Sequence, residues 1–408
     1  MGKKISFLFL SALFLPFCLP AQYFFTPPLL VPYLRDAPDI GSRAAVLIDA
    51  ETGALLYSKN PDEEISPASL TKLMTLHLAM REIEEGRASY DEIVPVTVES
   101  WAQSQPPRSS LMFLAPGQTV TLREIMLGLS VSSGNDAAVA VALRFAPAME
   151  DFARMMTDEA RRMGLYLTRF TESSGISEYN MTTASEFAYF CSQYIKLHPY
   201  SLREFHSAPV FSYPMAHNVP EIYRSNPRTI TQENRNNLLK TFPGVDGLKT
   251  GYIDESGYNI ALTAQRNDTR FIAVILGAPA EPAGVRIRDE DGSRLLSWAF
   301  ENFKTVRTGD VYLHKERLWK GKENEVRLIL AEPADFTSPL DRANTLFFET
   351  VIPDPLIAPL PAGFPAGYLV ISDEYGELKR VPLITAYSYE RGNFFKRLWH
   401  SILLLFKR

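Results

Sequence analysis

The chain has 408 residues, enough for two domains, and an ordinary globular composition with 46% hydrophobic and 22% charged residues. Its formal net charge of −5 argues against a nucleic-acid-binding protein. The six histidines show no metal-ligand spacing and no glycine-rich phosphate loop is present, so we expect neither a metal nor a cofactor.

The N-terminus has the pattern of an export signal. Lys3 and Lys4 supply a positive start, Ile5–Leu15 is an apolar run, and Ala21 is a small residue where cleavage could occur. We therefore predict a signal peptide over residues 1–21 and an exported, periplasmic or otherwise extracytoplasmic protein. Leu19 makes the cleavage site imperfect, so an uncleaved anchor remains an alternative.

The mature chain has too few cysteines for an intramolecular disulfide. Cys18 lies in the leader, which leaves only Cys191. Residues 22–42 are proline-rich and predict an extended lead-in. The runs Ala44–Asp49 and Ala54–Lys59 are rich in strand formers and flank a glycine turn, which predicts a β-hairpin.

A serine and a lysine three residues apart follow this hairpin. Ser66 is a good N-cap and Pro67 is tolerated at the first helical position, so Ser69 and Lys72 should share one face of a helix. A serine hydroxyl is a weak nucleophile unless a base takes its proton, and Lys72 fits that role if its pKa is lowered from about 10.4. The alternative is an ordinary helix start with a solvated lysine.

A second polar motif interrupts a helical region. Leu122–Leu129 and Asp136–Phe145 have helical patterns, and Ser133-Gly134-Asn135 lies between them. This corner presents a hydroxyl and an amide from a tight bend. The alternative is a simple interhelical turn, because Ser, Gly and Asn are favoured turn residues.

The next stretch predicts further helices and then strands. Helices are expected at Phe152–Met163 and Ala184–Leu197, with the loop Thr171–Gly175 between them, and a strand is possible at Val210–Asn218. The elements that follow are a strand at Leu248–Tyr252, an antiparallel pair at Asn259–Gln265 and Arg270–Leu276, and an amphipathic helix at Arg286–Phe303.

The strand at Leu248–Tyr252 carries Lys249, Thr250 and Gly251. The lysine and threonine supply a cation and a hydroxyl on one glycine-flanked strand. Because Gly251 lacks a side chain, we expect a ligand backbone to approach closely there.

Beyond residue 304 the pattern changes to short β-type runs separated by prolines. The runs Glu325–Leu330, Thr345–Val351 and Tyr368–Ser372, with a turn signal at Asp373–Gly376, predict a small all-β domain over residues 304–388. No catalytic group is evident in it.

Residues 389–408 end in a basic amphipathic segment, Asn393–Arg408. The apolar stripe of this segment includes Leu398, Trp399 and Ile402, and its charged residues are all Lys or Arg. The longest apolar run is far too short to cross a bilayer, so we expect a helix lying in the membrane surface. The alternative is a helix docked on this protein or on a partner.

The three motifs together resemble a known family. Ser69-Leu70-Thr71-Lys72, Ser133-Gly134-Asn135 and Lys249-Thr250-Gly251 stand in the order and spacing of the penicillin-binding proteins and serine β-lactamases. The flanking residues, including Asn234–Leu239 and Asp246–Tyr252, resemble one branch closely, the low-molecular-weight D-alanyl-D-alanine carboxypeptidases. The resemblance covers about residues 40–300.

The resemblance implies that Ser69 attacks a D-Ala–D-Ala bond of peptidoglycan stem peptides and forms an acyl-enzyme. Lys72 would be the general base, and Ser133 with Lys249 would pass a proton to the leaving amine. Asn135 would hold Lys72 and the substrate. The remaining residues that the resemblance assigns to substrate binding are Lys249, Thr250, Gly251 and Arg235. β-Lactam antibiotics would acylate Ser69.

The loop at residues 171–175 departs from the family pattern. It places Glu172 in the region where class A β-lactamases carry a deacylating glutamate, so a β-lactamase is one alternative. A non-catalytic cell-wall scaffold that retains the fold is another. Ser256 replaces the usual alanine after the third motif.

We therefore expect an α+β fold in which an antiparallel sheet is flanked by helices and carries an inserted helical subdomain. The expected order is leader (1–21), lead-in (22–42), catalytic domain (43–303), β-rich domain (304–388) and amphipathic membrane-anchor helix (389–408). The expected partners are peptidoglycan peptides, β-lactams and a membrane surface, with no nucleic acid.

Overall fold

The computed structural model of the protein describes residues 37–307, 313–341, 346–353, 355–374 and 376–406. The predicted signal peptide and most of the lead-in lie outside the described residues, as does Tyr375 of the predicted turn. These expectations therefore stay predictions.

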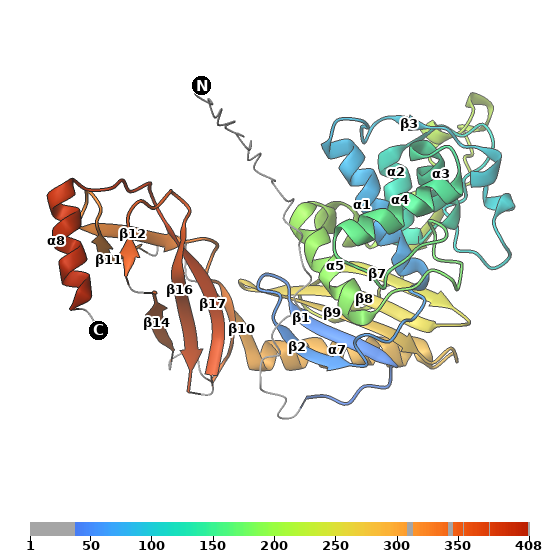
Figure 1. The fold of residues 1–408 in the computed structure, drawn as a ribbon. Coiled ribbons are helices and arrows are strands. Elements are labelled where there is room, and N and C mark those ends of the chain that lie inside the picture. Colours follow the sequence, from blue (N-terminus) through green and yellow to red (C-terminus); the bar gives the residue numbers. More distant parts are fainter. Residues whose placement is uncertain (1–36, 308–312, 342–345, 354, 375, 407–408) are drawn as a thin grey trace, which may run out of the picture.

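A five-stranded antiparallel sheet forms the middle layer of the larger domain, with the strand order β2-β1-β9-β8-β7 (Figure 1). The predicted hairpin and the predicted antiparallel pair are both confirmed. The strands are β1 (Ala44–Asp49), β2 (Leu55–Lys59), β7 (Val245–Ile253), β8 (Gly257–Arg266) and β9 (Thr269–Ala278).

Helices cover both faces of this sheet, which explains why β8 and β9 read as nearly continuous apolar runs. One face packs against the helical region and the other against α7 (Gly284–Asn302), and each interface has its own hydrophobic core (Figure 1). The expected α+β architecture with an inserted helical subdomain is confirmed.

The helical region is built from segments that the apolar periodicity predicted, with small shifts at their ends. Short two-stranded pairs, β3 with β4 and β5 with β6, complete it. The helices of this region are α1 (Lys72–Glu84), α2 (Leu122–Leu127), α3 (Asn135–Phe145), α4 (Met149–Arg162) and α5 (Ala184–Leu197). The short α6 (Leu238–Thr241) instead contributes to the core on the α7 face of the sheet. The short strands are β3 (Ile93–Val94), β4 (Val120–Thr121), β5 (Val210–Tyr213) and β6 (Ile230–Glu233).

A six-stranded sheet with its own core forms the second domain, and the predicted all-β character is confirmed. Its strand order is β14-β16-β17-β12-β11-β15, and β10 pairs separately with β13. The strands are β10 (Phe303–Val306), β11 (Leu313–Trp319), β12 (Glu325–Leu330), β13 (Phe336–Pro339), β14 (Phe347–Val351), β15 (Leu356–Ile357), β16 (Pro365–Asp373) and β17 (Gly376–Thr385).

The two domains are joined at the end of β1 by one buried carboxylate. Asp49 accepts hydrogen bonds from the hydroxyls of Thr305 on β10 (2.8 Å) and Thr337 on β13 (2.9 Å). Its other oxygen accepts the backbone N–H groups of Glu51 (2.9 Å) and Thr52 (3.2 Å). Asp49 therefore joins the β10–β13 pair to the first hairpin of the sheet.

The last helix, α8 (Phe394–Leu405), lies at the end of the β domain away from the larger domain (Figure 1). It is attached through His400, which is buried, packs edge-on against Trp319 and accepts a hydrogen bond from the Lys320 backbone. Its apolar stripe is exposed, with Trp399 at 59% and Leu405 at 77%. Within the described residues, no helix is both long enough and apolar enough to cross a membrane.

Candidate active site

The turn that carries Ser69 starts differently from the sequence expectation. A 3-10 turn (Ala68–Thr71) precedes α1, and Ser66 does not cap it, because the Ser66 hydroxyl is directed to the Ser177 carbonyl at 3.5 Å. Ser69 therefore lies in the 3-10 turn, and α1 itself begins only at Lys72. The tighter 3-10 turn still brings the two side chains together, because residues three apart eclipse in it.

The Lys72 amine is fully buried and touches three oxygens. Its Nζ lies 2.9 Å from Ser69 Oγ, 2.8 Å from Asn135 Oδ1 and 2.6 Å from the Ser174 carbonyl oxygen. The amide and backbone carbonyls can only accept, so they use two N–H bonds of a neutral amine. The third position of the nitrogen, directed at Ser69 Oγ, is then a lone pair.

The surroundings of Lys72 favour this neutral form. The pKa of Lys72 is lowered to about 7, mainly by burial; the Glu172 carboxylate acts in the opposite direction, the Arg235 cation in the same direction as burial, and Asp136 again in the opposite direction. A buried amine with a pKa near neutrality is suited to accept a proton from a hydroxyl.

The second motif is placed by a break in the helical region. The helix predicted over Leu122–Leu129 ends as α2 at Leu127 and continues as a π-helical turn over Gly128–Ser132. Ser133 then adopts a left-handed conformation with φ of 59°. This bend turns its hydroxyl toward the third motif, where the Lys249 Nζ lies 3.0 Å away.

Asn135 begins α3 and is held on both sides of its amide. Its oxygen accepts from Lys72, and its nitrogen donates to Ser109 Oγ at 3.2 Å. The expectation that this amide contacts Lys72 is therefore met, and Ser109 is an additional partner that the motif did not indicate.

The third motif lies on β7, the edge strand of the sheet. Lys249 is almost fully buried, and it donates to Ser133 Oγ and to the Thr250 carbonyl at 3.0 Å each. Burial, and after it the neighbouring Lys72 and Arg235 side chains, lower the pKa of Lys249 well below its usual range. Because β7 is an edge strand, its outer backbone groups have no neighbouring strand to pair with.

Gly251 lies against the protein's own backbone, whereas the sequence led us to expect a ligand backbone there. A Cβ at this position would lie 2.7 Å from the Pro67 carbonyl oxygen and 3.0 Å from the Ser69 backbone nitrogen. The close neighbour is the protein's own turn at Ser69, which β7 can approach only because Gly251 has no side chain.

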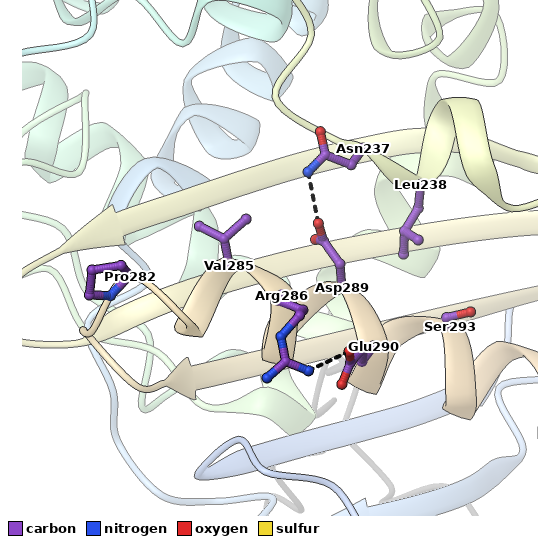
Figure 2. A pocket seen from close by; sticks show the side chains of 8 residues that line it. All are labelled: Asn237, Leu238, Pro282, Val285, Arg286, Asp289, Glu290 and Ser293. Atoms are coloured by element: carbon purple, nitrogen blue, oxygen red, sulfur yellow. Dashed lines mark hydrogen bonds and ion pairs between the residues drawn. The ribbon is translucent and has the colours of Figure 1, made fainter.

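Arg235 is exposed beside the site and is free to bind a ligand. Three asparagines around it anchor the segment: Asn234 donates to the carbonyls of His206 and Ala208, Asn236 to Gly247, and Asn237 to Asp289. Figure 2 shows Asn237 turned toward Asp289 across the hollow between α6 and α7. Within the described part of the chain, neither the Arg235 guanidinium nor the Thr250 hydroxyl has a hydrogen-bond partner.

Glu172 is engaged by its own loop. Its carboxylate accepts the Ser174 N–H and hydroxyl and the Gly175 N–H, each at 2.6 Å, and the Asn180 amide at 2.8 Å. These contacts hold the loop that presents the Ser174 carbonyl to Lys72. This geometry favours the reading of Glu172 as a loop carboxylate over a deacylating base.

Several supporting residues were not predicted. Asp136 accepts the backbone N–H groups of Met112, Phe113 and Leu114 and so holds the strand-like segment next to Ser109. Asn259 donates to the Ser66 carbonyl and to Ser256, both at 3.1 Å, which gives Ser256 a role in the loop before β8. The sequence shows that these polar residues stand beside the motifs. Their burial would have marked them as supporting residues, but burial is a property of the tertiary structure.

A nucleophilic serine, a buried lysine at its hydroxyl and a second lysine on an edge strand define a serine-type acyl-transfer hydrolase with the penicillin-binding fold. Residues 33–280 match the family described as D-alanyl-D-alanine carboxypeptidase, and residues 300–391 match the penicillin-binding protein 5 C-terminal domain. The chain belongs to the D-alanyl-D-alanine carboxypeptidase family.

Individual relatives agree with this assignment. The chain is 31% identical to the D-alanyl-D-alanine carboxypeptidase DacC of Escherichia coli, over 91% of this chain and 90% of that protein. Penicillin-binding protein 5 of Haemophilus influenzae has a similar structure, with a TM-score of 0.80, 28% identity and coverage of 88% and 100%. Penicillin-binding protein D2 of Listeria monocytogenes, in its cefotaxime-bound form, aligns with a TM-score of 0.56 and 26% identity, covering 65% and 100%.

Proposed function

We propose that this protein is a serine D,D-carboxypeptidase that removes the terminal D-alanine from peptidoglycan stem pentapeptides. The observation that carries the proposal is the buried Lys72 amine, 2.9 Å from Ser69 Oγ, with two of its three positions occupied by carbonyl oxygens. The membership of the D-alanyl-D-alanine carboxypeptidase family supports the choice of substrate.

In the acylation step, Lys72 takes the Ser69 proton while Oγ attacks the carbonyl carbon of the D-Ala–D-Ala bond. The oxyanion is stabilised by backbone N–H groups at Ser69 and on the outer edge of β7. Ser133 passes a proton to the leaving nitrogen, and Lys249, 3.0 Å from Ser133 Oγ, stabilises the hydroxyl as it transfers that proton. D-Alanine leaves and the shortened peptide remains as an ester on Ser69.

Substrate orientation follows from the two unpartnered groups beside β7. The Thr250 hydroxyl and the Arg235 guanidinium bind the terminal carboxylate, which places the scissile bond next to Ser69. Lys249 adds positive charge to this end of the site, and Gly251 lets β7 lie close to the Ser69 turn. Asn135 holds Lys72 through its oxygen.

In the second step, water attacks the ester carbonyl, Ser69 Oγ leaves as the alcohol after regaining a proton, and the enzyme is restored. A β-lactam has a strained amide that Ser69 can open in the same way, and its acyl-enzyme is released slowly. The cefotaxime-bound form of the Listeria relative supports penicillin binding as a property of this chain also.

We also propose that the protein acts outside the cytoplasm and lies peripheral to the cytoplasmic membrane. The N-terminal pattern of Lys3, Lys4 and Ile5–Leu15 supports export. The exposed stripe of α8, with Phe395 at 80% and Leu405 at 77%, supports insertion of this helix in the plane of the membrane surface.

Purified protein incubated with a peptide ending in D-Ala–D-Ala should release free D-alanine. A fluorescent penicillin should label the wild type and fail to label Ser69→Ala, while Ser104→Ala, an exposed serine on a neighbouring loop, should label normally. Folded protein that releases no D-alanine contradicts the proposal. Rapid multiple turnover of penicillin would instead indicate a β-lactamase, and absence of labelling a non-catalytic scaffold.

A further inference from the structure

Two buried histidines lie side by side beside the middle of the helix that begins with Lys72. His77 is on α1 and His198 follows α5, and both side chains are fully buried. His77 Nδ1 lies 2.9 Å from His198 Nε2. A hydrogen bond between two ring nitrogens requires a proton on one and a lone pair on the other.

The outer nitrogens of the same two rings face carboxylates. His77 Nε2 lies 2.8 Å from Glu159 Oε1, and His198 Nδ1 lies 2.7 Å from Glu84 Oε1. An ionised carboxylate only accepts, so each outer nitrogen must carry a proton.

Both carboxylates accept hydrogen bonds from further donors. Glu159 also accepts from Arg81 at 2.6 Å and from Arg162, and Glu84 accepts the Tyr200 hydroxyl at 2.9 Å. Burial acts to raise the pKa of Glu159, but the hydrogen bonds from His77 and Arg162 outweigh it and hold the pKa at about 2.

These contacts fix the number of protons. Two neutral rings, each with its proton on the outer nitrogen, would place two lone pairs against each other, and two imidazolium rings would place two N–H groups against each other. We propose that the folded protein holds three protons on this pair, with His77 as imidazolium and His198 as the neutral ring that accepts from it.

Charged and titratable groups surround the pair. Those on the packed elements that face the pair or pair with its partners are Arg81, Glu84, Glu85, Glu159, Arg162, Tyr194, Tyr200 and His206. The carboxylates of Glu84 and Glu159 contact the outer nitrogens of the two rings, where negative charge favours a bound proton. Burial lowers the pKa of His198, and the charge on His77 acts in the same direction.

A fixed proton makes the stability of this region depend on pH in both directions. An unfolded histidine has a pKa of about 6.5, so the unfolded pair holds fewer than three protons above that pH and more below it. Stability rises with pH where the unfolded state binds more protons. The pair therefore stabilises the fold most near pH 6.5, and its contribution declines toward both higher and lower pH.

The pair ties α1 to α4 through Glu159 and to the end of α5 through His198. Because α1 begins at Lys72, the helix that presents the proposed base is held near its middle by this shared proton. This support of the fold does not depend on the proposed reaction.

The proton count can be measured on the intact wild-type protein with ¹⁵N-labelled histidine. At pH 7.5, both ring nitrogens of His77 and one of His198 should give signals of the protonated class. His206 is an internal control, because its Nδ1 faces the Leu248 carbonyl and its Nε2 accepts from Tyr194, so it should show one protonated nitrogen. One protonated nitrogen on each of His77 and His198 would overturn the proposal.

Thermal unfolding across pH gives a second test. The melting temperature of wild type minus that of the double variant His77→Gln/His198→Gln should be greatest near pH 6.5, and this difference should fall by about 2–4 °C per pH unit on each side. His217→Gln, which removes an exposed histidine paired with Glu124, should follow the wild type in parallel. A difference that stays constant from pH 5 to 9 contradicts the shared proton, and the ¹⁵N measurement on the wild type is the deciding test if the double variant does not fold.

Discussion

The Ser174 carbonyl oxygen accepts a hydrogen bond of 2.6 Å from the Lys72 amine. This contact brings a loop that belongs to none of the three sequence motifs into direct contact with the proposed base. The loop is in turn held by Glu172, which accepts the Ser174 N–H and hydroxyl. The position of the Lys72 amine therefore depends on a carboxylate that it does not touch.

Replacing Glu172 with Gln should slow acylation of Ser69 by a fluorescent penicillin, because the loop that presents the Ser174 carbonyl loses its charged acceptor. We expect a loss of about tenfold, the size of one charge-assisted hydrogen bond. Glu178→Gln, an exposed change in the same loop, is the matched control. Normal acylation followed by an acyl-enzyme that no longer hydrolyses would instead identify Glu172 as a deacylating base.

The rate of acylation should rise with pH through about 7. Burial lowers the pKa of Lys72 to about 7, so the amine is protonated and inactive below that pH and is a free base above it. Stopped-flow labelling with a chromogenic β-lactam from pH 5 to 9 checks this. Above pH 7, Lys72→Arg should lose about 10²- to 10⁴-fold relative to the wild type, because a guanidinium does not give up its proton. A wild-type profile that is flat from pH 5 to 9 would argue against Lys72 as the base.

Arg235→Gln should weaken the reaction with peptides that end in a free carboxylate. A lost charge-assisted hydrogen bond predicts a fall of about 10- to 100-fold in kcat/KM. Hydrolysis of a matched peptide whose C-terminal carboxylate is amidated should change little. Arg224→Gln, which removes an exposed arginine earlier in the chain, should behave as wild type. An equal loss with both peptides would contradict carboxylate binding by Arg235.

Charges placed on the exposed stripe of α8 should release the protein from membranes. Leu398→Asp with Leu405→Asp should abolish sedimentation with vesicles that contain anionic lipid, because the carboxylates oppose both burial and the lipid charge. Ser401→Asp, which adds one carboxylate to the same helix outside the stripe, is the control. Unchanged binding of the double variant would show that α8 is not the anchor.

Asp49→Ala should destabilise the protein by about 1–3 kcal/mol, because the Thr305 and Thr337 hydroxyls and two backbone N–H groups lose their common acceptor. Urea unfolding followed by circular dichroism measures the change. Glu51→Ala, at the neighbouring exposed position, should cost less than about 0.5 kcal/mol. If the two substitutions lower the free energy of unfolding equally, Asp49 does not hold the two domains together.

Much of the fold followed from local pattern. The strands at Ala44–Asp49 and Arg270–Leu276 and the helix at Ala184–Leu197 were predicted because their apolar periodicity matches their burial. The prediction failed where backbone geometry is set by contact with distant segments. The 3-10 turn before Lys72 is one example, because it lies against β7 and the loop at Gly175. The π-helical turn before Ser133 is another, because it leads into the residue whose hydroxyl meets Lys249 on β7.

The sequence by itself determined the order of the three motifs, the residue types that attack, accept protons and carry charge, and the amphipathic character of α8. Only the tertiary structure decided that the Lys72 amine is buried, and that it contacts the Ser174 carbonyl. It also decided that Ser109 holds Asn135 and that Gly251 is required by the turn at Ser69. The physical reason is that periodicity and residue type act over a few neighbours, whereas burial and hydrogen-bond partners depend on segments far apart in the chain.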